Sequence, residues 1–93
     1  MKTKILFSPD YAGTSLYNDK AQNLPYKYVP LSPDLTKQLE EFDNSIWELC
    51  PGCKITKKRR EEIYKNGLRL CQLVSLELGD DYEVVEDLDW IKP

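Results

Sequence analysis

The chain contains no histidine, and this absence removes the side chain on which many active sites depend. Without imidazole, neither a Ser-His-Asp nor a Cys-His nucleophile can form, and zinc sites of the Cys2His2 and Cys3His types are excluded as well. Glycine is also scarce, with four widely spaced residues that form neither a phosphate-binding loop nor a dinucleotide-binding turn. We therefore expect a protein that is not an enzyme, with no catalytic residues, no cofactor and no metal.

Long apolar runs are missing too. Lys2 and Lys4 are like the start of a signal peptide, but only the three apolar residues 5–7 follow them. A secretory core needs about 7–15 apolar residues, and a membrane span needs roughly 20. We therefore expect a cytoplasmic protein without a membrane partner. In that reducing compartment we expect thiols at the three cysteines, which are Cys50, Cys53 and Cys71.

The length and charge of the chain limit what it can bind. Its 93 residues allow one hydrophobic core, so we expect a single domain over residues 1–93. The 13 basic and 16 acidic residues give a net charge of −3, which argues against a nucleic-acid partner because such proteins are normally basic. Both a monomer and a dimer are compatible with the sequence, since an exposed edge strand could pair with a second copy.

Alternating patterns predict a strand near each end of the chain. Residues 2–7 form the first, with Ile5 and Phe7 on one face, and residues 82–86 form the second. The order strand, long connection, helix, helix, strand predicts a small two-layer α+β domain. In this fold the N- and C-terminal strands pair antiparallel to each other, and a two-helix hairpin packs on one face of the sheet.

Two amphipathic helices are predicted between these strands. The first has Ser32 as its N-cap and Pro33 at its first position, and it ends before the Pro-Gly pair at 51–52. The second runs over residues 56–78, with Gly67 on its apolar stripe, where it permits close approach to the first helix. The apolar stripe of the first helix consists of Leu35, Leu39, Phe42, Ile46 and Leu49.

The connection over residues 8–33 is rich in proline and tyrosine, with four of the six residues of each type. A structureless loop of this length is unusual in a compact domain. We therefore expect residues 26–29 to form a short edge strand, and the tyrosines to pin the rest of the segment onto the core.

The sequence Cys50-Pro-Gly-Cys53 is the one pattern with a named chemistry. A Cys-x-x-Cys pair can cycle between dithiol and disulfide, and with Cys71 and a carboxylate it could bind zinc. The redox pair normally opens a helix after a strand, whereas this one follows a helix. We favour a turn with incidental cysteines, and a small thiol redox or metal-binding module is the alternative function.

Basic residues gather at the start of the second predicted helix. The favoured interpretation is a solvated helix end in which Lys57 pairs with Glu61, and Lys58 with Glu62. The alternative is a contact with phosphate or with an acidic partner. The basic cluster consists of Lys54, Lys57, Lys58, Arg59 and Arg60.

Acidic residues dominate the C-terminal part, where seven of them between positions 77 and 93 are opposed only by Lys92. Acids around aromatic anchors suit the binding of a basic protein, because they speed encounter and the rings supply buried contact area. The alternative is a solubility role that protects an edge strand from aggregation. The predicted partner-binding residues are Asp80, Asp81, Tyr82, Glu83, Glu86, Asp87, Asp89 and Trp90, followed by Tyr11 and Tyr17 in the long connection.

Short pieces spread over most of the chain form a further pattern, which consists of Asp10-Tyr11, Ser15-Leu16-Tyr17, Leu31-Ser32-Pro33-Asp34-Leu35, Leu39, Phe42, Trp47, Gly67-Leu68 and Glu77-Leu78-Gly79-Asp80-Asp81-Tyr82-Glu83-Val84. This pattern resembles small bacterial immunity proteins of contact-dependent and polymorphic toxin–immunity systems. The resemblance implies a cytosolic protein that binds and neutralises one cognate toxin domain, in many cases a nuclease, without catalytic residues of its own. The Cys50–Cys53 turn and the basic cluster lie outside the pattern.

Overall fold

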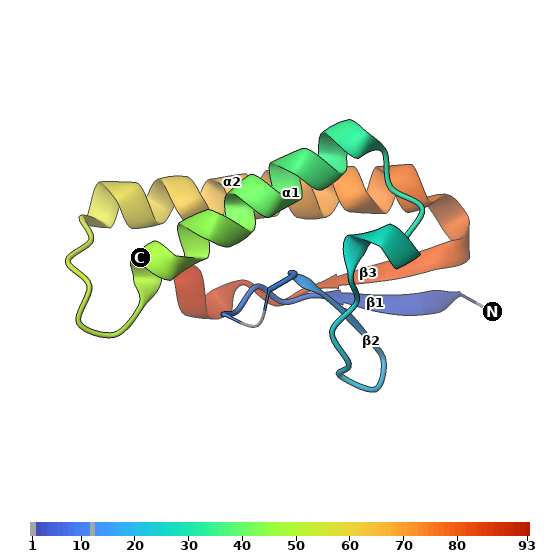
Figure 1. Cartoon of the computed structure of the whole chain (residues 1–93), viewed down its shortest axis with the longest axis horizontal. Coiled ribbons are helices and arrows are strands. Elements are labelled where there is room, and N and C mark those ends of the chain that lie inside the picture. The colour runs from blue at the N-terminus through green and yellow to red at the C-terminus, as the bar shows by residue number, and fades with distance from the viewer. Residues whose placement is uncertain (1, 12) are drawn as a thin grey trace.

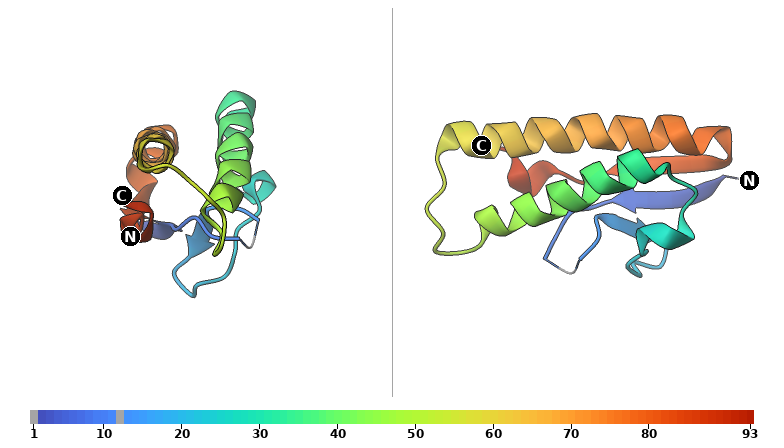
Figure 2. Two further views of the ribbon diagram at one scale, coloured as in Figure 1. Left: turned by 90° about the vertical axis from the view of Figure 1, so that its left-hand side faces the viewer. Right: turned by 45° about the horizontal axis from the view of Figure 1, so that its top comes forward.

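Two helices cover one face of a three-stranded sheet (Figures 1 and 2). The structure is a computed structural model, and it describes residues 2–11 and 13–93. The strand order β2-β1-β3 places the two terminal strands side by side, which confirms the predicted two-layer α+β domain. In chain order the elements are β1 (Thr3–Phe7), β2 (Leu16–Asn18), α1 (Pro33–Ile46), α2 (Lys57–Leu78) and β3 (Tyr82–Glu86).

The terminal strands pair in parallel, so the prediction of an antiparallel pair is wrong. Ile5 of β1 lies opposite Val84 of β3, and both strands run in the same direction (Figure 1). The reason is β2, a three-residue strand that turns the chain back alongside β1 before α1 begins. With that extra reversal, the helix hairpin returns the chain to the end of the sheet where β1 starts, as a parallel crossover requires.

The predicted strand over residues 26–29 is wrong as well. Tyr26–Tyr28 form a single turn of 3-10 helix, and the strand of this connection lies earlier, at β2. The tyrosine prediction holds in part, because Tyr26 is buried in the core whereas Tyr28 is exposed. Val29 follows the turn and is buried too, so the segment is anchored by side chains rather than by strand pairing.

The first helix begins and packs as its sequence predicts. Ser32 caps α1 by accepting a hydrogen bond from the Leu35 backbone N–H at 3.2 Å, and Pro33 occupies the first turn. Helix α1 ends at Ile46, and a turn of 3-10 helix over Trp47–Leu49 leads into the Pro-Gly turn. All five residues of the predicted apolar stripe are buried.

The second helix approaches the first at Gly67. A Cβ atom at this position would lie 3.0 Å from Cζ of Phe42 on α1 and 3.4 Å from Cδ1 of Leu88. Thr56 caps the start of α2 through the Arg59 backbone N–H, and Gly79 ends it with φ 73°, a value that glycine adopts without strain. The predicted role of Gly67 in close helix approach is confirmed.

The core fills the space between the helices and the inner face of the sheet. Ile5 and Phe7 of β1 and Leu16 of β2 are buried there, and the Phe7 ring lies 6.0 Å from the Phe42 ring, centroid to centroid. Across residues 2–11 and 13–93, no helix combines the length and apolar character that crossing a membrane requires.

Replacing Gly67 with valine tests the close approach of the helices. The larger side chain has to displace Phe42 or push α1 away from α2, so we expect the free energy of unfolding to fall by about 1–3 kcal/mol. Urea denaturation followed by circular dichroism measures the loss. Gln72→Val, at an exposed position of α2, controls for a β-branched residue within a helix. Equal losses in the two variants would contradict this account of the packing.

Candidate partner-binding site

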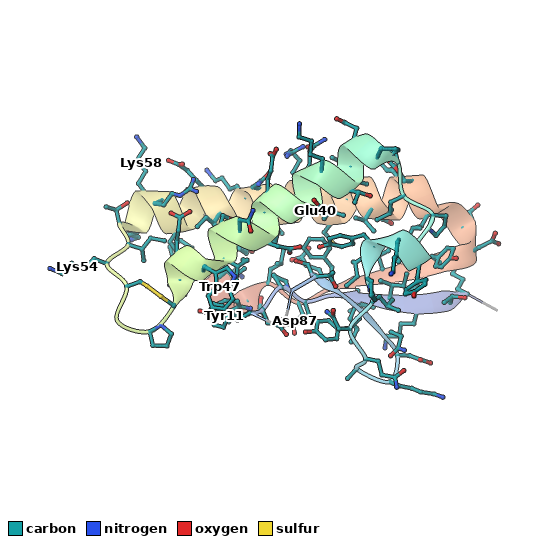
Figure 3. The ribbon with its side chains drawn as sticks, in the orientation of Figure 1. Tyr11, Glu40, Trp47, Lys54, Lys58 and Asp87 are labelled. Carbon is teal, nitrogen blue, oxygen red and sulfur yellow. A yellow bond between two sulfur atoms is a disulfide. The ribbon has the colours of Figure 1, made fainter. Side chains whose placement is uncertain are left out.

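Three aromatic rings meet at one end of the molecule, and we call Tyr11, Trp47 and Trp90 the aromatic triad. The Tyr11 ring lies 5.0 Å from the Trp47 ring and 6.1 Å from the Trp90 ring, measured between centroids. Tyr11 and Trp47, both labelled in Figure 3, come from the loop after β1 and the turn after α1, and Trp90 comes from the turn after β3. Their exposed fractions are 37%, 57% and 39%, so much of this aromatic surface faces solvent.

Trp90 is fixed in place by hydrogen bonds on both sides. It lies in a 3-10 turn, Asp89–Ile91, in which Ile91 is fully buried. The indole N–H of Trp90 donates to the carbonyl of Pro9 at 3.1 Å. The Arg60 guanidinium donates to the carbonyls of Trp90 at 2.7 Å and Ile91 at 2.9 Å, which ties the turn to α2. The ring is therefore presented to solvent by a fixed backbone.

Trp47 is held by its neighbours in the turn after α1. Ile46 before it is buried, while the Glu48 carboxylate after it receives two hydrogen bonds from Arg59 of α2, at 2.9 Å and 2.7 Å. These bonds lower the pKa of Glu48, and they connect the turn to the start of α2. Trp47 thus lies between a buried apolar residue, Ile46, and an ion-paired residue, Glu48.

Two residues of the basic cluster, Arg59 and Arg60, form these internal contacts. Arg59 also pairs with Glu62 at 3.4 Å, and Glu61 pairs with Lys65 at 2.9 Å. Glu62 thus pairs with Arg59 and not with Lys58 as predicted. Lys65 is the ion-pair partner of Glu61, and the pKa of Glu61 is lowered by Lys65 and also by the charge of Lys57. Lys54 and Lys58 project from the connecting loop and the start of α2 (Figure 3).

Asp10 and Asp89 are the chain neighbours of Tyr11 and Trp90, and Asp87 lies directly after β3; we call these three acids the acidic rim. The Ser8 hydroxyl donates to the Asp87 carboxylate at 3.1 Å, which holds that carboxylate beside the loop after β1. The Tyr17 hydroxyl donates to the Asp10 carboxylate. Burial, together with this bond, raises the pKa of Tyr17 to about 12. Hydrogen bonds thus hold two acids of the rim, Asp10 and Asp87, in the segments that lead to Tyr11 and Trp90.

The remaining predicted residues are distributed along β3. Tyr82 is half-buried and packs against the core, so it offers less free ring surface than the triad. Asp80 and Asp81 lie in the turn before β3, while Asp87 follows its last residue. A strand of five residues spans roughly 16 Å, so the predicted acids form a strip with separated ends and not one cluster.

Trp47 is the functional candidate that the sequence-based prediction of the site omits. It lies between Ile46 and Leu49 of the buried stripe, and therefore points away from the core side of the helix. A tryptophan off the apolar stripe of an amphipathic helix is a usable signal for an interaction surface. Only the fold, however, brings it to Tyr11 and Trp90, which are 36 and 43 positions away in the sequence.

A second polar site surrounds Asp43 on α1. Its carboxylate accepts hydrogen bonds from the Ser15 hydroxyl at 2.5 Å and the Tyr26 hydroxyl at 2.6 Å, and Tyr26 accepts from the Ser15 backbone N–H at 3.0 Å. Burial raises the pKa of Asp43 to about 6. The carboxylate lies in an open groove of about 870 Å³ between α1 and the connection before it. Because both carboxylate oxygens already have partners, the site fastens that connection to α1.

Cys50 and Cys53 are joined by a disulfide across the Pro51-Gly52 turn, so the prediction of three thiols is wrong for this pair. The turn brings their Cα atoms to 5.5 Å, a separation that a disulfide can bridge. Cys71 is a free, buried thiol, and burial raises its pKa to about 11. In the described part of the chain, no three cysteine or carboxylate side chains are grouped to hold a metal, so the predicted alternative of a zinc site has no ligand set there.

Comparison with known proteins assigns no family to this geometry. No protein-family model, no curated protein and no solved structure matches the chain. The aromatic triad and its acidic rim therefore carry the functional argument.

Replacing Asp43 with asparagine tests the buried carboxylate through its pH dependence. The folded-state pKa of about 6 is above the unfolded value of 3.8, so between these values the folded state binds more protons. The carboxyl group therefore adds stability as pH falls from 7 to 4 and loses it as pH rises. We expect the difference in unfolding free energy between wild type and Asp43→Asn to shift by about 2 kcal/mol in favour of the wild type over this range.

Urea denaturation at several pH values between 4 and 7.5 measures this difference. Glu41→Gln controls for the loss of one exposed carboxylate from α1. If the loss of unfolding free energy in Asp43→Asn depends on pH no more than the loss in Glu41→Gln does, this account of the Asp43 carboxylate is wrong.

Proposed function

We propose that this chain is a non-enzymatic protein of the immunity type, which binds and neutralises a cognate bacterial toxin domain in the cytoplasm. The observation that carries the proposal is the aromatic triad. Its rings are 37–57% exposed although hydrogen bonds and buried neighbours fix the backbone beneath Trp47 and Trp90. Tyrosine and tryptophan supply much of the binding energy at protein interfaces, and a preformed surface reduces the entropy lost on binding.

The charge of the surrounding surface favours a basic partner. None of the six acids predicted for the surface forms an ion pair within residues 2–11 and 13–93. Their field is therefore available to a partner, and it would steer a basic domain toward the triad. Toxin domains that cleave nucleic acids are such partners, because they hold phosphate with basic side chains.

The disulfide supports a second candidate, a thiol redox module. Its geometry lacks the feature that activates such cysteines, because α2 begins at Lys57, four residues after Cys53, and no cysteine caps a helix N-terminus. A thiol titration of the reduced protein separates the two functions. A Cys50 or Cys53 pKa well below about 8.5 would support the redox module, whereas ordinary values would exclude an activated thiol.

Alanine substitutions at Trp47 and Trp90 test the triad. If the reading frame immediately upstream of this chain's own encodes a basic domain, that domain is the probe, with affinity measured by isothermal titration calorimetry. We expect each substitution to weaken binding by about thirtyfold, which corresponds to roughly 2 kcal/mol for a hot-spot residue.

The matched control is Tyr28→Ala, which removes an aromatic ring that is 71% exposed and lies in the connection before α1. Binding that is unaffected by either tryptophan substitution, or an upstream domain that neither binds the chain nor arrests growth in its absence, would contradict the proposal.

Charge reversal tests the acids. We expect the combined variant Glu86→Lys, Asp87→Lys and Asp89→Lys to slow association with the same domain by about tenfold or more at low salt, and by less at high salt. Reversing Asp34, Glu40 and Glu41 on α1 changes the net charge equally and is the control. Equal association rates for the two triple variants in stopped-flow measurements would exclude local steering by the acids.

A further inference from the structure

The sheet has two edges, and the chain closes one of them itself. On the outer side of β2, the Leu24 backbone N–H donates to the Leu16 carbonyl at 2.8 Å, and the Asn18 N–H donates to the Gln22 carbonyl at 3.0 Å. An isolated bridge joins Tyr17 to Asn23 in the same place. The β2 edge is therefore already occupied.

The β3 edge is open. The Asp87 N–H donates to the Phe7 carbonyl at 2.9 Å, which shows that the backbone groups of odd-numbered residues in β3 face β1. Because these groups alternate along a strand, those of Tyr82, Val84 and Glu86 face away from the sheet. Within residues 2–11 and 13–93, the N–H groups of Val84 and Glu86 and the C=O groups of all three residues have no hydrogen-bond partner, whereas the Tyr82 N–H donates to the Gly79 carbonyl. Such an edge is a template for another strand.

The charge along β3 decides which strand fits. Acidic residues precede, interrupt and follow the strand, and their side chains would face those of any added strand. A second copy of this chain would bring acid against acid, and like charges on opposite strands destabilise their pairing. A segment with lysine or arginine at alternate positions would instead meet opposite charge. The acids concerned are Asp80, Asp81, Glu83, Glu86 and Asp87.

We propose that an extended, basic segment of the partner protein adds to β3 as the fourth strand of the sheet. This inference rests on the proposed function, because it specifies how the basic partner is held. The edge leads directly into the acidic rim and the aromatic triad, since only residues 87–89 separate β3 from Trp90. Main-chain hydrogen bonds supply the pairing, and the flanking acids select a basic segment.

Amide exchange of the full chain, measured by NMR, tests this directly. The probe is an acetylated and amidated heptapeptide of alternating lysine and threonine. We expect the N–H groups of Val84 and Glu86 to exchange about tenfold more slowly with the peptide bound, because they become hydrogen-bonded. Those of Glu83 and Val85 already face β1 and should change little. A peptide with glutamate in place of lysine should protect none of them.

Proline at position 84 removes an outward N–H without breaking a bond within the sheet, since edge strands tolerate proline on their free side. We expect Val84→Pro to lower peptide affinity by about tenfold or more relative to Val84→Ala, which keeps the N–H group, with similar thermal unfolding of the two variants. If Val84→Pro does not fold, the wild-type chain is titrated with the basic peptide N-methylated at alternate residues, and this peptide should not bind.

Three results would overturn the inference. One is a binding response without alternate-residue protection, which would indicate electrostatic attraction alone. Another is protection at the outer side of β2. The last is protection of β3 that rises with protein concentration in the absence of peptide, which would assign the edge to a second copy. Trp47→Ala should keep the peptide pairing, so a failure at the edge and a failure at the aromatic triad are distinguishable.

Discussion

The close approach of Gly67 to Phe42 and Leu88 holds together the part of the molecule that carries the aromatic triad. It joins α2 to α1 on one side and to the segment after β3 on the other. Trp47 extends from the end of α1, and Trp90 lies two residues beyond Leu88, so the position of both rings depends on this junction. A surface assembled from three distant parts of the chain thus acquires its geometry from the core beneath it.

The helices are the part of the fold that local sequence determines best. Ser32 and Thr56 are caps that act through neighbouring backbone groups, and a stripe repeating every three or four residues needs no knowledge of the rest of the chain. The strand direction is different, because it depends on the number of reversals between β1 and β3. A three-residue strand such as β2 has little periodicity to reveal it, and its pairing with β1 supplies the stability that its own sequence does not.

Of the candidate site, too, the sequence reveals one part and only the tertiary structure reveals the other. The abundance of acid near the C-terminus and the aromatic character of Tyr11 and Trp90 are visible in the sequence, but their separation into a strip and a triad is tertiary. The basic cluster shows the limit most clearly. Arg59 and Arg60 look like a free positive patch, yet Arg59 binds carboxylates and Arg60 binds carbonyls of the C-terminal turn. Side chains that suggested a contact with an acidic partner instead hold the turns that carry Trp47 and Trp90.

The β2 edge of the sheet is closed and the β3 edge is open, and this difference limits how an assembly can grow. Residues 22–24 already occupy the outer side of β2. The open β3 edge of one copy therefore cannot pair with β2 of another copy. Growth in which β3 of one copy pairs with β2 of the next, a route to fibres, is thus blocked. A sheet with one closed side therefore offers a single edge for strand addition, which favours finite complexes over filaments.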